Sequence, residues 1–407
     1  MQLEKYNSLD SRDFKKLKEV FNTKILSDFL AKGNKKFYGG KYVQKFEKEV
    51  QSYFKVKYAI TVNSWTSGLI CIMGALDIEP GDEVILPSWT MSACMTAILN
   101  WGAIPIFADV DIDSYCIDPN SVKKLINKKT KAIMAVDIFG GKADYKVLKK
   151  IADRKKIHLI CDSAQSIGSK YYGKLAGTMY EATGYSLNCH KHIQTGEGGL
   201  ILTNSKYVAE KCFRIRNHGE NQTSKSKKQL INNLGYNFRL TELQSALGIS
   251  QLEKLKEKVK SRQKIARIFD KELNKFNWLK LSVPSRLVEN SYYVYPIRLL
   301  VNNKIKLKSI TSLICKRFKE SGFDAASLGY TTLHKLDVSK KKILYGSKGF
   351  PWSLNKKIPK TNFTNIEKLN KSVILIQMCK YELKKKKEID YVKKIIRKIF
   401  SDVQNLL

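Results

Sequence analysis

Closely spaced cysteine pairs are missing from the sequence. The eight cysteines are scattered over 407 residues, and no two of them form a Cys-x-x-Cys pair. Disulfide frameworks and structural zinc sites both rely on short, recurring cysteine spacings. We therefore expect reduced, mostly buried thiols, and we expect no bound metal.

Long apolar runs are missing as well. No run approaches the roughly 18 apolar residues that a membrane-spanning helix needs, so the sequence predicts no membrane span. The first residues, Met1-Gln2-Leu3-Glu4-Lys5, lack the apolar core of a signal peptide. A cytoplasmic protein is the expectation that follows.

Acidic residues are few, because 37 Asp and Glu stand against 74 Lys and Arg, and the formal net charge is +37. Such a charge suits nucleic acid or other anionic partners. The basic residues, however, spread over the whole chain, many at helical spacing, and no arginine-rich arm or RNA-binding signature is present. We interpret most of them as solvated surface, expect no nucleic-acid partner, and expect the charge to favour anionic substrates such as nucleotides.

The first 250 residues contain a regular alternation of strand-like and helix-like segments. Helix-like stretches such as Ser67–Leu76 and Ser92–Trp101 separate the apolar runs. The strand-like runs are 58–62, 83–87, 104–107, 132–136, 158–161, 183–187 and 199–203. This alternation predicts an α/β fold with a mainly parallel sheet.

Two domains are expected from the chain length. Hydrophobic residues make up 43% of the sequence, which suffices for a sizeable core. Residues 241–264 read as one long helix, which would link a large α/β domain, residues 1–255 with an N-terminal helical segment, to a smaller α+β domain, residues 256–407. The second part contains a strand-like run at 292–300.

One lysine differs from the rest. Lys191 lies between a strand-like run and the cluster Gly196-x-Gly198-Gly199, with no acidic residue in its own turn. A lysine that does chemistry must lose its proton near neutral pH, through desolvation or a cationic neighbour. His190 and His192 flank it and could be that neighbour or could line the substrate entrance. Two histidines at alternate positions are poor evidence for a metal site.

Asp162 follows the strand-like run 158–161, with Gln165 three residues later. A carboxylate at a buried strand end is either a helix N-cap or the charge partner of a heteroaromatic nitrogen. Trp89 follows the run 83–87 and is either a core residue or a ring that stacks on a planar ligand.

A third loop, with Ser64, Trp65 and Thr66, leads into a helix. The start of a helix binds phosphate readily, although simple Ser/Thr capping explains this loop equally well. Since ligands of open α/β sheets bind where strands end, these residues could all converge on one edge. A lysine, a carboxylate, an aromatic ring and an anion-binding helix start are together what pyridoxal 5'-phosphate (PLP) needs.

Six motifs occur in an order that is specific as a set. They are Phe37-Tyr38-Gly39-Gly40, Gly81 to Pro87, Pro105 to Asp111, Asp162-Ser163-Ala164-Gln165, Ser186-x4-Lys191-x4-Gly196-Glu197-Gly198-Gly199 and Gly235 to Ala246. With them, nearly the whole chain resembles the DegT/DnrJ/EryC1/StrS sugar aminotransferases. The resemblance implies the PLP-dependent transferase fold of aspartate aminotransferase, with a large domain and a smaller α+β C-terminal domain.

The resemblance also implies a role for each matching residue. Lys191 would bind PLP covalently and then move a proton between the substrate carbon and the cofactor. Asp162 would pair with the ring nitrogen, Gln165 would lie by the ring hydroxyl, and Trp89 would stack on the ring. Contacts to the phosphate would come from Ser64, Trp65, Thr66 and Ser186 and, across a homodimer interface with shared active sites, from Asn237.

The implied substrates are a nucleotide-linked keto-deoxysugar and an amino-acid donor, typically glutamate. The product would enter a cell-surface polysaccharide or glycolipid. His218 would lie near the sugar or cap a loop.

Three positions depart from the family pattern. Trp65 stands where glycine is usual, which puts a close backbone approach to the phosphate in doubt. Asp137 replaces a common histidine, and Asn188-Cys189-His190 differs from the usual residues before the lysine.

Two alternatives stay open. One is a PLP-dependent nucleotide-sugar dehydratase of the same fold, in which histidine replaces the lysine; the glycine spacing after Lys191 favours lysine. The other is a non-catalytic regulatory or nucleic-acid-binding protein on the same scaffold.

Overall fold

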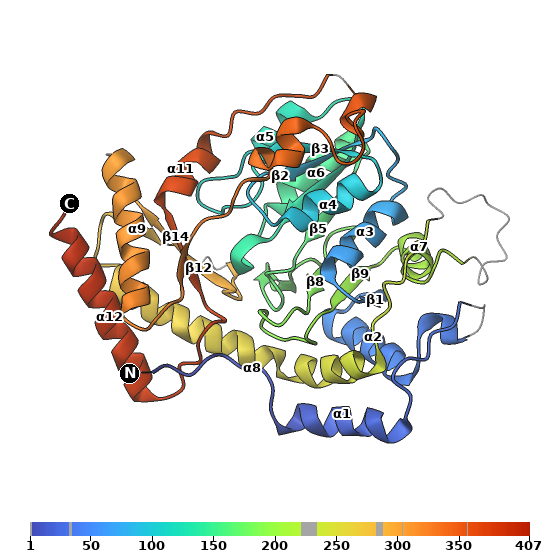
Figure 1. Cartoon of the computed structure of the whole chain (residues 1–407), viewed down its shortest axis with the longest axis horizontal. Coiled ribbons are helices and arrows are strands. Elements are labelled where there is room, and N and C mark those ends of the chain that lie inside the picture. Colours follow the sequence, from blue (N-terminus) through green and yellow to red (C-terminus); the bar gives the residue numbers. More distant parts are fainter. Residues whose placement is uncertain (1, 32–34, 221–233, 282–287, 303, 356) are drawn as a thin grey trace.

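The computed structural model describes residues 2–31, 35–220, 234–281, 288–302, 304–355 and 357–407 (Figure 1). A seven-stranded sheet forms the centre of the larger part of the molecule. Its order is β1 (Tyr58–Val62), β9 (Gly199–Thr203), β8 (Ala182–Ser186), β5 (His158–Asp162), β4 (Thr130–Val136), β2 (Glu83–Pro87) and β3 (Ile104–Ala108). In this sheet β9 is antiparallel to both neighbours, and the other pairs are parallel. The predicted mainly parallel α/β sheet is confirmed.

Helices precede, connect or follow these strands along the chain. They are α2 (Lys41–Phe54), α3 (Trp65–Ala75), α4 (Ser92–Asn100), α5 (Pro119–Leu125), α6 (Tyr145–Lys155) and α7 (Lys206–Arg216). Every residue of β2, β8 and β9 is buried. Strands buried on both faces are what a largely parallel sheet covered on both sides requires.

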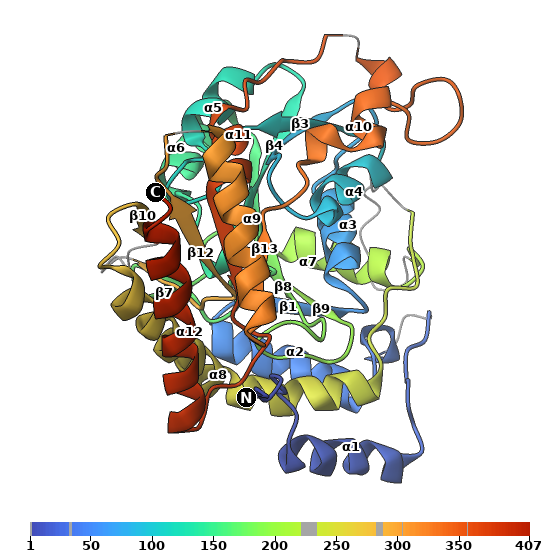
Figure 2. The same cartoon turned by 60° about the vertical axis from the view of Figure 1, so that its left-hand side comes forward.

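The long helix α8 (Glu242–Leu273) crosses the lower part of the molecule in Figure 1. It begins at Thr241, whose side chain forms a capping box with Gln244. Helix α1 (Ser11–Thr23) packs against α8 from below in Figures 1 and 2. The predicted helix is confirmed, and it continues beyond Lys264 to Leu273.

A four-stranded antiparallel sheet follows, in the order β10 (Leu279–Leu281), β12 (Val294–Leu299), β14 (Val373–Gln377) and β13 (Ala326–Leu328). Helices α9 (Lys304–Glu320) and α12 (Lys386–Gln404) lie side by side next to it (Figure 2). A third, small sheet joins β11 (Val288–Glu289), β6 (Lys170–Tyr171) and β7 (Lys174–Leu175). The remaining short elements are η1 (Lys35–Tyr38), η2 (Ile138–Gly140), η3 (Leu333–Lys335), α10 (Asp337–Lys341), η4 (Trp352–Leu354) and α11 (Thr364–Ser372).

The hydrophobic core around the large sheet includes residues from the C-terminal part of the chain. Leu333, Trp352 and Leu369 belong to the same buried cluster as the strands of the large sheet. The expected division after residue 255 falls inside α8, which is unbroken there. The position of the domain boundary stays a prediction. Within the described ranges, no helix is both long and apolar enough to cross a bilayer.

Candidate active site

Three of the predicted site residues lie at one edge of the large sheet. Asp162 ends β5, Ser186 ends β8, and Ser64 follows β1. Gly199 pairs with Val62 on one side and with Ser186 on the other, so the ends of β1 and β8 meet at this residue. The predicted convergence is therefore present for Asp162 and Ser64, and Ser186 lies at the same edge.

Lys191 lies in the loop 187–198, which joins β8 to β9. Backbone bonds close this loop on itself, from Leu187 N to Gly198 O and from Cys189 N to Gly196 O, each 2.9 Å. Gly196 has a φ of +77°, which only glycine adopts readily. The Lys191 ammonium lies 4.2 Å from the centroid of the Tyr293 ring.

Burial lowers the pKa of Lys191 to about 8, although the negative charge of Asp162 acts in the opposite direction. A lysine with this pKa carries a substantial fraction of free amine near neutral pH, and the free amine is the nucleophile. Desolvation, one of the two causes predicted, is therefore the one at work.

Asp162 is buried and accepts three hydrogen bonds. Its Oδ1 accepts from Trp65 Nε1 at 2.6 Å and from Ala164 N at 3.0 Å, and its Oδ2 accepts from Cys94 Sγ at 3.0 Å. The alternative that Asp162 caps a helix is wrong, because residues 163–169 form turns. Its charge instead faces Lys191 closely enough to influence the pKa of that lysine.

Trp65, the first departure from the family pattern, is the first residue of α3. Its side chain is buried in the core, where it packs against Gly68 and Gly184. A Cβ added to Gly68 would lie 2.7 Å from the indole, and one added to Gly184 would lie 2.3 Å from it. The indole thus packs against α3 and β8, and its N–H donates to Asp162.

The start of α3 has the geometry both for capping by a serine and for binding a phosphate. Ser64 caps the helix, since its Oγ accepts from Ser67 N at 3.1 Å. Capping leaves the first amides of the helix, those of Trp65 and Thr66, without an acceptor inside the helix. A Cβ on Gly199 would lie 2.8 Å from the Ser64 backbone, so glycine there allows strand and helix start to meet.

Gln165 and Trp89 lie in a buried aromatic group. Gln165 Oε1 accepts from Phe139 N at 2.8 Å, and its Nε2 donates to Tyr330 Oη at 3.0 Å. Trp89 is fully buried, packs edge-to-face on Phe139 at 5.5 Å, and donates from Nε1 to Asn370 Oδ1 at 2.8 Å. The structure thus gives Trp89 the surroundings of a core residue, and its stacking role stays a prediction.

The two histidines beside Lys191 have different surroundings. His192 is fully buried, its Nε2 donates to Ser291 O at 2.8 Å, and burial lowers its pKa to about 4. A neutral, buried imidazole is neither a cationic neighbour of Lys191 nor a surface that a substrate can touch, so the expectation for His192 is corrected. His190 is exposed.

His218 and Asn237 lie at the surface. His218 is exposed with a φ of +62°. Asn237 is also exposed; its carbonyl accepts from Asn63 Nδ2 at 3.3 Å, and its Oδ1 accepts from Arg239 Nε at 2.7 Å. Asn63 lies directly before the start of α3, so Asn237 is tied by its backbone to the helix start while its side chain faces outward.

Asp137, the second departure, forms a buried ion pair. Asp137 Oδ2 lies 2.9 Å from Lys142 Nζ, and both side chains are fully buried. Ser163 Oγ and Ala143 N also donate to this carboxylate, at 3.1 and 3.0 Å. The residue that replaces the common histidine is therefore a structural one, one strand away from Asp162.

Three residues of this site were not among the predicted ones: Cys94, Tyr330 and Tyr293. Tyr293 falls in the run 292–300, for which the sequence predicts only a strand. Each is far from Lys191 or Asp162 in sequence, and no local pattern distinguishes them. Among the described residues, no group of three or more His, Cys, Asp or Glu side chains is arranged to hold a metal ion.

Residues 22–356 match the model of the DegT/DnrJ/EryC1/StrS aminotransferase family. A GDP-perosamine synthase of Vibrio cholerae is 39% identical over 58% of this chain and 63% of its own length. A GDP-perosamine synthase of Escherichia coli O157:H7 is 34% identical over 63% of this chain and 70% of its own. The chain thus spans less than two thirds of the first of these relatives.

Among solved structures, PseC of Helicobacter pylori, an aminotransferase involved in the biosynthesis of pseudoaminic acid, superposes with a TM-score of 0.82. It is 25% identical, and the match covers 99% of this chain and 100% of PseC. The predicted family and fold are confirmed. The chain belongs to the DegT/DnrJ/EryC1/StrS aminotransferase family.

Proposed function

We propose that this protein is a PLP-dependent aminotransferase that moves an amino group from an amino acid, glutamate first among them, to a nucleotide-linked keto-deoxysugar. The observation that carries the proposal is the electrostatic interaction between Lys191 and Asp162. A desolvated lysine, with its pKa lowered to about 8, lies within electrostatic reach of a buried carboxylate at one sheet edge.

The residues present fit PLP in chemistry and in charge. Lys191 supplies the amine for a covalent link, and Asp162 supplies a carboxylate for the ring nitrogen. The amides at the start of α3 and the hydroxyls of Ser64 and Ser186 supply donors for a phosphate. Gly199 lets the backbone of this start approach the sheet closely.

When bound, PLP supplies an electron sink and carries the amino group. Asp162 then holds the proton on the ring nitrogen, and its own orientation is held by Trp65, Cys94 and the Ala164 amide. Lys191 Nζ moves the proton at the substrate carbon that bears the nitrogen. Burial of Asp162 keeps water away from the ring-nitrogen side of the site.

Gln165 is proposed to lie by the ring hydroxyl, and Trp89 to cover the ring. We also propose a homodimer in which Asn237, whose side chain is exposed, reaches the phosphate of the neighbouring subunit's site. His190 and His218, both exposed, are the histidines that we keep as candidates for the sugar side.

The names of the relatives support the substrate class. Two are GDP-perosamine synthases, and PseC is an aminotransferase involved in the biosynthesis of pseudoaminic acid. A GDP-linked keto-deoxysugar is therefore the first acceptor to test. We place the activity in the cytoplasm and its product in cell-surface polysaccharide or glycolipid synthesis.

The test uses purified protein with PLP, glutamate and a panel of GDP- and UDP-linked keto-deoxysugars, read by mass spectrometry. The expected product carries an amino group in place of the keto oxygen, and Lys191→Ala abolishes it. Lys174→Ala, which removes an exposed lysine, is the matched control and retains activity. Protein that binds no PLP, or that turns over no acceptor, contradicts the proposal.

The same assay separates the alternatives. A dehydratase would release sugar that has lost water and gained no nitrogen. A regulatory or nucleic-acid-binding protein would give no turnover and would bind nucleic acid with a strong dependence on salt.

A further inference from the structure

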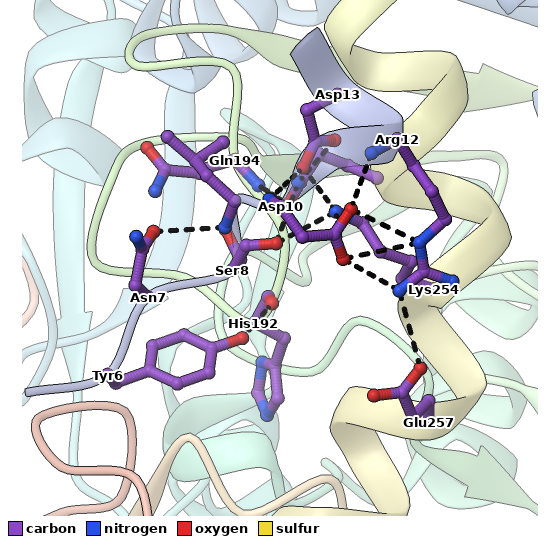
Figure 3. Close-up of polar contacts among 12 residues, drawn as sticks. Tyr6, Asn7, Ser8, Asp10, Arg12, Asp13, His192, Gln194, Lys254 and Glu257 are labelled. Atoms are coloured by element: carbon purple, nitrogen blue, oxygen red, sulfur yellow. Dashed lines mark hydrogen bonds and ion pairs between the residues drawn. The ribbon is translucent and has the colours of Figure 1, made fainter. Parts of the chain in front are cut away.

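The loop that carries Lys191 forms a hydrogen bond with a residue from the N-terminal segment of the chain. The next residue, His192, accepts a hydrogen bond on its main-chain oxygen from the Tyr6 hydroxyl, at 2.5 Å. Figure 3 shows Tyr6 reaching the His192 carbonyl from the N-terminal segment. One bond thus connects the N-terminal segment to the peptide group between His192 and Ile193, one residue beyond Lys191.

Tyr6 is itself fixed by the C-terminal part of the chain. Its amide donates to Lys380 O at 3.0 Å, and the Arg262 guanidinium lies 4.2 Å from the centroid of its ring. Arg262 is fully buried and donates to Met378 O at 2.6 Å and to Tyr381 O at 2.9 Å. The tyrosine ring therefore has little freedom to turn its hydroxyl elsewhere.

A second connection runs through α8. Gln251 Oε1 accepts from Gln194 N at 3.2 Å, and Gln251 Nε2 donates to Ser8 O at 3.1 Å and to Asp13 Oδ1 at 2.9 Å. Lys254 donates to Ser8 O at 2.8 Å and also binds Asp13. The N-terminal segment is therefore connected to the Lys191 loop at two positions, directly through Tyr6 and indirectly, through Gln251, at Gln194.

The contacts between the N-terminal segment and α8 are buried and would be costly to break. Gln251 and Lys254 are essentially fully buried, and Asp13 is 2% exposed. Lifting the segment would leave the Lys254 ammonium without the carboxylate of Asp13, and an uncompensated buried charge is strongly unfavourable. The arrangement therefore suits a fixed support for the loop and does not suit a lid.

We propose that Tyr6 is a positioning residue for Lys191: its hydroxyl fixes the peptide group between His192 and Ile193, and so holds the loop that places the lysine amine at the Tyr293 ring and near Asp162. Tyr6 precedes residues 22–356, which match the family, so the family pattern assigns it no role. The proposal rests on the proposed function, since it concerns the lysine that would bind PLP.

The test compares Tyr6→Phe with Tyr391→Phe in the full chain. Both changes remove a tyrosine hydroxyl that donates to a main-chain oxygen, and Tyr391 donates to Ser321 O at 2.8 Å in the C-terminal part. Without cofactor, Tyr6→Phe should speed amide hydrogen exchange in a peptide covering 190–195 about fivefold, as loss of one net hydrogen bond predicts. Tyr391→Phe should leave that peptide unchanged.

A second readout follows the lysine itself. With PLP added, the pH midpoint of the visible absorbance of the Lys191-linked cofactor should shift in Tyr6→Phe and stay at the wild-type value in Tyr391→Phe. A purely structural loss would lower the melting temperature of both variants without separating them at Lys191. Equal exchange and equal midpoints in the two variants would overturn the proposal.

Gln251→Met keeps the test decisive if Tyr6→Phe does not fold, because it breaks the second connection with a side chain of similar length. It should speed exchange in the same peptide, and exchange at the wild-type rate would overturn the proposal. The exchange readout needs no cofactor. If no variant and no wild-type protein binds PLP while Tyr6→Phe still speeds exchange, the proposed function falls and the anchoring by Tyr6 stands.

Discussion

The indole N–H of Trp65 donates to Asp162 Oδ1 at 2.6 Å, from a position where the family usually has glycine. These two residues are 97 positions apart in the sequence. The indole fits under the sheet edge because Gly68 and Gly184 carry no side chains where they meet it. Trp65 therefore acts on the carboxylate that we assign to the ring nitrogen of PLP.

Replacing Trp65 by Phe tests this relationship. The ring volume is largely kept, while Asp162 Oδ1 loses one of its two donors. Since a hydrogen bond to a charged group contributes about 1.5–3 kcal/mol, PLP should bind roughly tenfold or more weakly. The measurement is the PLP dissociation constant, taken by absorbance titration.

Trp101→Phe is the matched control for that change. Trp101 is also buried and donates from Nε1 to Ile70 O at 2.8 Å, away from Asp162. It should lower the melting temperature as Trp65→Phe does and leave PLP affinity unchanged. Equal PLP affinities in the two variants would show that the Trp65 bond serves the fold alone.

The pH dependence of Lys191 follows from its lowered pKa. Because the pKa falls from 10.5 to about 8, modification of Lys191 by an amine-reactive reagent should rise with pH through a midpoint near 8 in cofactor-free protein. Asp162→Asn should move that midpoint lower, since the Asp162 charge raises the pKa. Peptide mass spectrometry gives the rates, with exposed Lys206 as internal reference. A midpoint near the ordinary value of about 10.4 would contradict the burial described here.

The same shift has a defined sign for stability. Between pH 8 and about 10.4 the unfolded chain holds the Lys191 proton and the folded protein does not. The contribution of Lys191 to the free energy of unfolding is therefore least favourable below pH 8 and improves as the pH rises through this window. In Lys191→Met the free energy of unfolding, measured by denaturant titration, should rise less between pH 8 and about 10.4 than it does in the wild-type protein.

The Asp137–Lys142 pair predicts a large loss of stability. Asp137→Asn leaves the Lys142 ammonium buried without a counter-charge, which should lower the free energy of unfolding by about 3–5 kcal/mol. Combining it with Lys142→Met should recover most of the loss. Asp153→Asn breaks the exposed pair with Lys149 and should change little. Denaturant titration decides, and similar losses for the two Asn variants would refute the structural role.

The strands of the large sheet could be predicted because each is a short apolar run followed by a turn signal. The placement of Asp162 and Ser64 at one edge then followed from the rule that ligands bind where parallel strands end. Lys191 was identifiable because it lies between a strand-like run and a glycine cluster. For these residues the local sequence pattern was enough to predict the position in the fold.

The rest depends on contacts between distant segments. Nothing near Trp65 in the sequence shows that its indole reaches Asp162. His192 is buried, and its Nε2 donates a hydrogen bond to the main-chain oxygen of Ser291, 99 residues later, so its sequence position next to Lys191 was misleading. The Tyr6 contact spans 186 residues. Such pairings need the folded chain, because periodicity and propensity describe only neighbours.

The most direct test of the account is the identity of the lysine that binds PLP. The protein is incubated with PLP, reduced with borohydride, digested and analysed by peptide mass spectrometry. The account predicts one dominant phosphopyridoxyl modification, on Lys191 in the peptide containing Asn188-Cys189-His190-Lys191, and its loss in Lys191→Ala. Modification spread over the exposed lysines, with Lys191 unmodified, would contradict it.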